Sequence, residues 1–391
     1  MSRIRGNCES SLVKTRQLTK KEPEVNHRER FLRTFQFKEI DRVPDYEFGF
    51  WDETIIRWHK EGLPPEKRTN RDIELYLGLE GWDCLEWLPI RTGFWPPLPS
   101  RIIKEEEGRA IVDDGMGGIY LCTVGSSSPP HYLKHPLKNR EDWERLRRFF
   151  DPETPGRFPL NWEEIAKSYR DRDYPLGISV GSLYGWLRNW MGVERISVAF
   201  YRDPEWIAEM MDTLVDLWIS IIRRALRDVK VDFASWWEDM CYSKGPLLSV
   251  RHFEEFMVPR YRKVTEVLKE YGVTINVLDC DGNITRLVPG WLKGGINCMF
   301  PLEARFTDAY KIRGEFGHQV LLMGYVDKRA LIQGGKAIDR ELNRLTPLLE
   351  DGGFIPLVDH RCPPEVSYQT YRQYLKKKRE WIGREDAELP P

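Results

Sequence analysis

The pattern of hydrophobic and polar positions becomes regular after Tyr174. From there on, short and uniformly apolar runs alternate with longer stretches whose apolar residues recur every three or four positions. Uniformly apolar runs are typical of parallel strands buried on both faces, and the longer period is typical of amphipathic helices. Strands are therefore predicted over residues 175–182, 231–239, 273–283, 296–303, 319–327 and 353–360.

Helices are predicted between and after these strands. They cover residues 204–229, 250–272, 284–295, 307–317, 327–334, 339–350 and 367–381. Asp203 followed by Pro204 is a helix-start signal, with the aspartate as N-cap and proline at the first helical position. Repeated strand–helix units of this size favour an α/β fold of the (β/α)8 TIM-barrel type over an open doubly wound sheet. Neither a GxGxxG nor a GxxxxGK[ST] motif follows any strand, which disfavours nucleotide-binding folds.

The N-terminal part of the chain has a different pattern. Residues 1–26 are predicted to form a flexible arm, and residues 27–391 a single barrel domain. A short amphipathic helix over residues 27–37 is followed by an extended segment (41–50) and by helices over 51–60 and 70–79. Residues 101–124 alternate in polarity and contain Glu-Gly and Gly-Met-Gly-Gly turn signals, so they predict an antiparallel β-hairpin inserted into the barrel.

Composition narrows the class of protein. The 391 residues carry a net charge of -1, so no overall field favours nucleic acid or an anionic membrane. The seven cysteines are scattered without a CxxC pair, and no segment has the length of a signal peptide core or a membrane span. We therefore expect a cytoplasmic protein. The KKKR run at 376–379 is predicted to be a solvated helix face. The 15 tryptophans indicate aromatic pocket walls or a large apolar interface as well as core.

Acidic residues follow five consecutive predicted strands. A barrel of this type builds its active site at the C-terminal ends of its strands. Each acidic residue alone is equally well explained as a helix N-cap or a solvated loop residue, and for Asp327 the N-cap is favoured. Together the residues predict one acidic rim, made of Glu238 and Asp239, Asp279 and Asp281, Glu303, Asp327, and Asp359.

The segment Val277–Asn283 carries the most informative pair. Asp279 and Asp281 are two residues apart, so in an extended strand their carboxylates point to the same face, whereas Cys280 points to the core. Two carboxylates this close repel each other unless one is protonated or a cation lies between them. With His360 at the end of the last strand, they predict a site for Zn, Mn or Fe. The alternative for His360 is a hydrogen-bonded rim histidine.

Five segments resemble the uroporphyrinogen decarboxylase superfamily, which contains the decarboxylase of haem synthesis and cobalamin-dependent methyltransferases. The resemblance covers most of the chain from Arg28 on and implies a (β/α)8 barrel with its site at the strand C-termini. It is carried by RERFLRTFQFKEIDRVP, WEDMCYSKGPLLSVRHFEEFMVPRYRKV, INVLDCDGNITRLVPGWLKGGINCMFPLE, VLLMGYVDK and GGFIPLVDHRCPPEVS.

Two departures from the family pattern narrow the range of reactions that we expect of this protein. The resemblance places Asp279 and Asp281 where the methyltransferases carry a zinc-binding His-x-Cys, and places His360 at or next to their later cysteine. Two carboxylates and an imidazole are a harder ligand set, which argues against methylation of a thiol. The haem-pathway decarboxylase has an arginine-rich motif where this chain reads DRVPDYEFGFWDETIIRW, so an octacarboxylate substrate is disfavoured.

Three hypotheses follow. In the first, the protein is a methyltransferase or demethylase that takes a methyl group from a small substrate to a corrinoid, free or on a partner protein. In the second it is a decarboxylase or other lyase acting on a small substrate, and in the third a non-catalytic binding relative. Expected roles are acid–base catalysis for Glu238, Asp239, Glu303 and Asp281; substrate binding for Trp236, Trp237, Asn283, Tyr325 and Asp359; and metal binding for Asp279, Asp281 and His360. The N-terminal arm and the tryptophan content suggest a homodimer.

Overall fold

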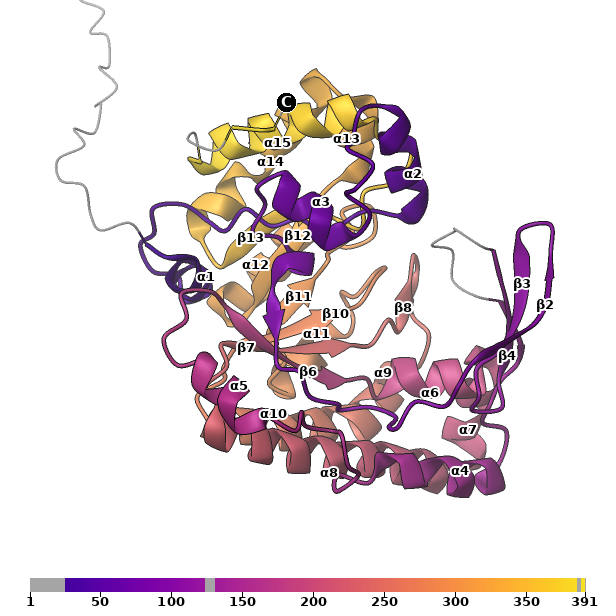
Figure 1. Cartoon of the computed structure of the whole chain (residues 1–391). Helices are drawn as coiled ribbons and strands as arrows, with labels where there is room; N and C mark the ends of the chain where they lie inside the picture. The colour runs from indigo at the N-terminus through magenta and orange to yellow at the C-terminus, as the bar shows by residue number, and fades with distance from the viewer. Residues whose placement is uncertain (1–24, 124–130, 385–387, 391) are drawn as a thin grey trace, which may run out of the picture.

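The computed structural model describes residues 25–123, 131–384 and 388–390. The predicted N-terminal arm lies outside these residues except for Val25 and Asn26. Seven parallel strands form one curved sheet in the order β1-β6-β7-β10-β11-β12-β13 (Figure 1). Their bounds are β1 Glu86–Trp87, β6 Leu176–Gly181, β7 Phe233–Trp237, β10 Asn276–Asp279, β11 Cys298–Phe300, β12 Leu321–Val326 and β13 Phe354–Val358. The six strands predicted after Tyr174 are all present, and the α/β, TIM-like fold is confirmed.

The extended segment 45–50 lies between the two ends of this sheet. On one side, the amides of Glu80 and Trp82, just before β1, donate to the carbonyls of Asp45 and Glu47. On the other side, the amide of Cys362, just after β13, donates to Gly49 O. A parallel bridge pairs Phe50 with Cys362. The segment therefore takes the place of an eighth strand and connects the sheet edges.

Helices surround the parallel sheet. In the N-terminal part these are α1 His27–Phe35, α2 Asp52–Lys60, α3 Asn70–Tyr76, α4 Arg140–Arg147 and α5 Trp162–Ser168. Next come α6 Tyr184–Met191, α7 Val193–Arg202, α8 Pro204–Asp228, α9 Val250–His252 and α10 Val258–Glu270. The last are α11 Val288–Lys293, α12 Ala309–Phe316, α13 Lys328–Gln333, α14 Lys336–Asp351 and α15 Tyr368–Ile382. As predicted, the Asp203 side chain caps α8 by accepting from the Trp206 amide.

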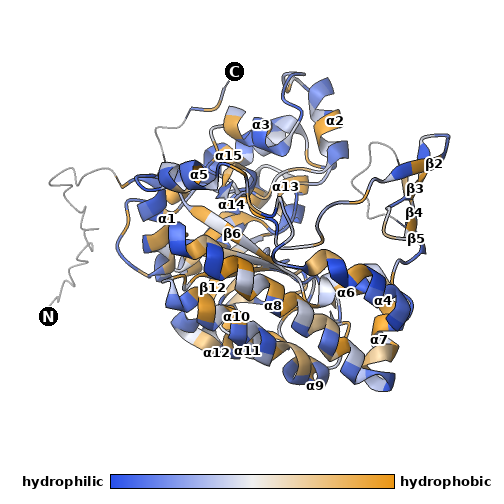
Figure 2. Ribbon diagram, turned by 60° about the horizontal axis from the view of Figure 1, so that its bottom comes forward, coloured by the Kyte–Doolittle hydropathy of each residue, from blue (hydrophilic) through white to orange (hydrophobic). Residues whose placement is uncertain are grey.

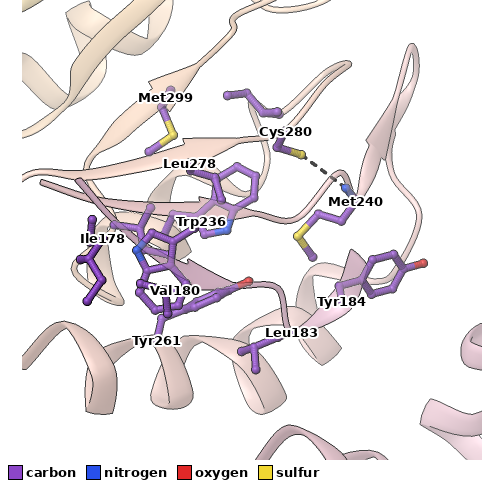
Figure 3. Close-up of a cluster of buried hydrophobic side chains, with 14 of the residues drawn as sticks. Ile178, Val180, Leu183, Tyr184, Trp236, Met240, Tyr261, Leu278, Cys280 and Met299 are labelled. Atoms are coloured by element: carbon purple, nitrogen blue, oxygen red, sulfur yellow. Dashed lines mark hydrogen bonds between the residues drawn. The ribbon is translucent and has the colours of Figure 1, made fainter. Parts of the chain in front are cut away.

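Side chains that alternate along the strands build two apolar layers. Phe233, Val277 and Phe300 point to the barrel interior. Residues of the opposite parity, such as Ile178, Trp236 and Leu278, pack against the helices, as Figure 3 shows for the face covered by α10. In Figure 2 the surrounding helices carry both blue and orange residues, while β6 carries orange and pale residues and no strongly hydrophilic one. The uniformly apolar strands of the sequence are thus explained by burial on both faces.

The predicted hairpin insertion is larger than expected. It is a four-stranded antiparallel sheet with the order β2-β3-β4-β5, made of β2 Arg101–Glu106, β3 Arg109–Asp113, β4 Ile119–Thr123 and β5 His131–Lys134. Both views show this sheet standing to one side of the barrel (Figures 1 and 2). A short antiparallel hairpin, β8 Cys241–Tyr242 with β9 Gly245–Pro246, follows β7.

The KKKR run in α15 is not the solvated face that its charge predicted. Lys376 is exposed, but Lys378 and Arg379 are 0% and 2% exposed. Lys378 Nζ lies 2.7 Å from Glu47 Oε1 and 3.2 Å from Asp45 Oδ1. One side of the helix therefore anchors the segment that closes the barrel. No helix in the described ranges is long and apolar enough to cross a membrane.

Candidate active site

The Asp-x-Asp pair lies where β10 ends. Asp279 has the same parity as Val277, so its side chain points to the barrel interior above the apolar core. Cys280 points the opposite way, as predicted: it is 2% exposed, and its Sγ accepts from the Met240 amide at 3.4 Å (Figure 3). Gly282 has φ +81°, and an added Cβ would lie 2.8 Å from the Tyr242 carbonyl. A glycine is needed for the chain to turn here.

Asp281 and His360 are in direct contact. His360 Nε2 lies 3.2 Å from Asp281 Oδ2, although the two residues are 79 positions apart. The imidazole stacks on Trp51, with ring centroids 5.0 Å apart and an interplanar angle of 22°. Asp281 Oδ1 is buried and has no hydrogen-bond partner among the described residues. The prediction that His360 at the end of the last strand reaches the two aspartates after β10 therefore holds for Asp281.

Asp279 lies in an environment that favours its neutral form. Burial raises the pKa of the Asp279 carboxyl well above its ordinary value, and the carboxylates of Asp281 and Asp239 raise it further. The Arg361 guanidinium opposes this shift. Arg361 Nη1 lies 3.5 Å from Asp83 Oδ2, and burial also raises the pKa of Asp83. The environment of Asp279 thus favours the protonated carboxyl over the carboxylate.

Asp239, which follows β7, lies close enough to Asp279 and Asp281 to interact with their charges. Its backbone has φ +44°, a left-handed conformation that a non-glycine residue seldom adopts. Arg188 of α6 holds it there by donating to both its backbone carbonyl and its side chain, the latter over 3.0 Å to Oδ2. Burial raises the pKa of Asp239 despite Arg188, and Asp281 adds to the rise. Strained backbone of this kind is concentrated at functional sites.

Glu303 and Asp359 belong to a second group on the same rim. Lys328 Nζ lies 3.1 Å from Glu303 Oε1 and 3.5 Å from Asp359 Oδ1. Glu303 Oε2 also accepts from the Gly282 amide at 2.8 Å, which connects this group to the turn after Asp281. Burial raises the pKa of Asp359 to about 6 against the pull of Lys328. Burial works against the charge of Lys328, but the two carboxylates outweigh it and raise its pKa.

Glu238 is fully buried and is engaged by the loop after β6. Its carboxylate accepts from the amides of Leu183 at 2.9 Å and Tyr184 at 2.8 Å, and from Ser182 Oγ at 3.0 Å. Burial raises its pKa nonetheless. These contacts make Glu238 a residue that positions the start of α6, and so Arg188. They give no support to the acid–base role predicted for it.

Two of the predicted substrate-binding residues lie away from the barrel mouth, the opening at the C-terminal ends of the parallel strands. Trp236 is 1% exposed and packs edge-on against Trp218 and Tyr261 in the sheet–helix layer (Figure 3). Tyr325 is 5% exposed and faces Tyr310 and Arg344. Its displacement follows from positive φ at Gly324 and Tyr325, which breaks the alternation of β12. These positions give no support to a role in substrate binding.

The other predicted binding residues stay near the strand ends. Trp237 has the inward parity, is partly exposed and carries the Arg188 guanidinium 5.6 Å from its ring centroid. The Asn283 side chain accepts from the Thr285 amide at 3.2 Å and so shapes the turn after β10. Asp359, described above, is 1% exposed and accepts from the Ala304 amide at 3.0 Å.

Several residues at the mouth were not found by sequence reasoning. Trp82 stacks on Phe300 with centroids 4.7 Å apart and meets Trp87 edge-on at 5.4 Å, and both tryptophans are partly exposed. They come from a segment with little regular strand or helix pattern, so only the high tryptophan content signalled them. Arg188, Arg361, Asp83 and Trp51 were missed as well. Arg361 follows His360 directly and had the clearest signal.

The predicted metal site does not fit the side chains as placed. Within the described ranges, no group of three or more His, Cys, Asp or Glu side chains is arranged to hold a metal ion. Asp281 and His360 meet, but Asp279 does not complete a three-ligand set with them.

Comparisons with known proteins agree with this architecture. The family model described as Uroporphyrinogen decarboxylase (URO-D) matches residues 118–381, and the chain belongs to that family. A solved structure named "methyltransferase from Methanosarcina mazei" is similar with a TM-score of 0.57. The alignment covers 91% of this chain and 99% of the other, at 14% sequence identity. At this identity the likeness shows the fold alone.

Proposed function

We propose that the protein is a corrinoid-linked methyltransferase that demethylates a small methylated substrate at the mouth of the barrel. Support comes from the family, from the methyltransferase fold neighbour and, above all, from Asp279. The corrinoid is a co-substrate, free or carried by a partner protein, and supplies the nucleophile that accepts the methyl group. The bond between the methyl carbon and its heteroatom breaks, and the heteroatom must then take up a proton.

Asp279 is the proposed source of that proton. Burial and the carboxylates of Asp281 and Asp239 raise the pKa of its carboxyl and so favour the protonated form, which can protonate the departing heteroatom. Asp281 and His360 form the adjacent wall, and Trp51 stacked on His360 supplies an apolar surface for the substrate. Since Asp279 must be protonated to act, activity falls as pH rises through its raised pKa.

The test measures methyl transfer to free reduced cobalamin. The purified protein is incubated with a small methyl ether, a methylamine and a methyl thioether, and methylcobalamin is followed by its absorbance. With the best donor, Asp279→Asn should lower kcat by about 100-fold or more with little change in KM, because the amide keeps the shape but cannot act as an acid.

Asp327→Asn is the matched control. Asp327 is also a strand-end aspartate, but it caps α13 by accepting from the Arg329 amide and pairs with the Arg329 side chain. It should keep nearly full kcat. Equal activity of the Asp279→Asn variant and wild type would refute the acid role, and no transfer from any donor would count against the methyltransferase proposal.

A decarboxylase acting on a small substrate is the second candidate. The observation that favours it is the presence of two guanidinium groups at the mouth, Arg188 and Arg361, either of which can bind a carboxylate. Release of carbon dioxide from small carboxylic acids without any methyl transfer would favour this reaction over the first.

A bound metal is a separate question. The buried and unpartnered Asp281 Oδ1 favours a cation at this point, whereas the lack of a three-ligand group among the described residues disfavours one. Metal analysis of protein purified without a chelator decides between them: near-stoichiometric Zn, Mn or Fe that is lost in Asp281→Ala supports a ligand role.

A further inference from the structure

The inserted sheet has an exposed outer edge. β2 is the terminal strand in the order β2-β3-β4-β5, and all six of its residues are exposed. Figure 1 shows β2 at the side of the sheet away from the barrel strands. Ile102 and Ile103 are 60% and 51% exposed. An edge strand presents unpaired backbone N–H and C=O groups, which are a template for pairing with another strand.

The apolar face of the sheet ends abruptly at this edge. Ile102 pairs with Val112 of β3, and Val112 is 9% exposed. Glu105 pairs with Ala110, which is 3% exposed, so Ile102 and Glu105 share the covered face. A further strand beside β2 would continue this face and cover Ile102.

The opposite face of β2 carries charges of both signs. Arg101 pairs with Asp113 and Glu106 with Arg109 across the β2–β3 ladder. Because the register shifts between Ile102 and Lys104, Arg101 and Glu106 lie on the same face of the sheet although they are five positions apart. On this face the strand thus carries Arg101 at its start, Lys104 in its middle and Glu106 at its end, with Lys104 Nζ 2.8 Å from Glu106 Oε2.

We propose that β2 pairs antiparallel with β2 of a second copy of this chain, around a twofold axis, to make one continuous sheet. In an antiparallel pair made of two identical strands, the register with Arg101 opposite Glu106 also places Ile102 opposite Glu105. That register matches each face of one strand to the same face of the other. It forms two ion pairs between the copies, and the strand is self-complementary as a twofold interface requires.

The test measures the dimer dissociation constant by sedimentation velocity. The full-length wild type should dimerise. Ile103→Lys should weaken the dimer by at least about tenfold. In this register the introduced lysine of each copy lies opposite Lys104 of the other, so two pairs of like charges form. Leu133→Lys is the matched control: Leu133 is 53% exposed on β5, the other edge strand, and its substitution should leave the dimer unchanged.

A charge exchange tests the register itself. Arg101→Glu and Glu106→Arg should each weaken the dimer about tenfold, and the double variant should restore it, because it recreates both ion pairs with their signs reversed. A monomeric wild type, or a dimer insensitive to Ile103→Lys, overturns the proposal. So does loss of the dimer on deletion of residues 1–24, since the arm would then be the contact. Failure of the double variant to recover overturns this register.

Discussion

Two groups of charged side chains in this molecule are built in opposite ways. Near α15, Lys378, Arg379 and Arg384 surround Asp45, and Lys378 also pairs with Glu47. Burial would raise the pKa of Asp45, but these cations outweigh it and lower the pKa. At the barrel mouth, Asp279 faces two other carboxylates and its pKa is raised well above normal. The first arrangement favours the charged form of its aspartate, and the second favours a neutral acid.

The difference separates a structural cluster from a chemical one. A buried carboxylate surrounded by cations holds two segments together, and its lowered pKa favours the form without a proton. A carboxyl among like charges contributes little to stability, but its raised pKa favours the protonated form that a general acid needs. Substitutions that remove charge should therefore have opposite consequences in the two places.

The largest stability effect is expected for Lys378→Met. Removing this cation leaves Asp45 and Glu47 buried with less compensation, which should lower the free energy of unfolding by about 3–5 kcal/mol. Urea denaturation at pH 7 measures it. Lys376→Met, two residues earlier and exposed, should change stability by less than about 0.5 kcal/mol. Similar losses for both variants would mean that the contacts of Lys378 with Asp45 and Glu47 contribute nothing to stability beyond the effect of replacing a lysine in this helix.

The next largest effect concerns the pH dependence due to Asp359. Its pKa of about 6 in the folded protein is above the ordinary 3.8, so the unfolded chain releases this proton first. The contribution of Asp359 therefore favours the folded state below about pH 4 and is lost as pH rises to about 6. The wild type should lose about 2–3 kcal/mol relative to Asp359→Asn across this window. Parallel stability curves for the two proteins between pH 4 and 7 would contradict the raised pKa.

A smaller effect is expected for Glu238→Gln. The carboxylate accepts from two amides and a hydroxyl, and glutamine keeps only one acceptor oxygen, so one buried amide faces an NH2 group. The free energy of unfolding should fall by about 1–3 kcal/mol. Glu266→Gln, on the exposed side of α10, is the control and should be neutral. Thermal and urea unfolding of both variants would show whether the loop after β6 depends on this carboxylate.

The smallest stability change is expected for Asp281→Asn. It removes a carboxylate from the acidic group, so the free energy of unfolding should change by less than about 1 kcal/mol. The same change should lower the pKa of Asp279, because one of the charges that raise it is gone. The alkaline limb of the pH–kcat profile should therefore move to lower pH. A stability loss as large as that of Lys378→Met would remove the distinction between the two clusters.

Sequence periodicity was sufficient for the parallel strands of the barrel and for one contact at their C-terminal ends. Uniformly apolar runs identified the strands, and Asp203-Pro204 marked the start of α8, because these features depend on local chemistry and on burial of both sheet faces. The contact between Asp281 and His360 was also foreseen, since the C-terminal ends of parallel strands share one edge.

Features set by backbone conformation or by distant partners could not be foreseen. The side of the sheet to which Tyr325 points depends on positive φ at Gly324 and at Tyr325 itself. The burial of Lys378 depends on Asp45 and Glu47, more than 300 positions earlier. Trp82 precedes β1 and Arg188 lies in α6. No periodic pattern in these segments indicates that their side chains point to the barrel mouth.

The segment 45–50 has a consequence for how the chain folds. The segment completes the barrel only when Cys362 bonds to its Gly49 carbonyl and when Lys378 of α15 bonds to Glu47. Lys378 and Glu47 are 331 positions apart. Contacts between such distant residues close the largest loops and form late. During synthesis, segment 45–50 can therefore take its final place in the barrel only after α15 has left the ribosome. Closure is then a final and cooperative event that joins the two halves of the chain.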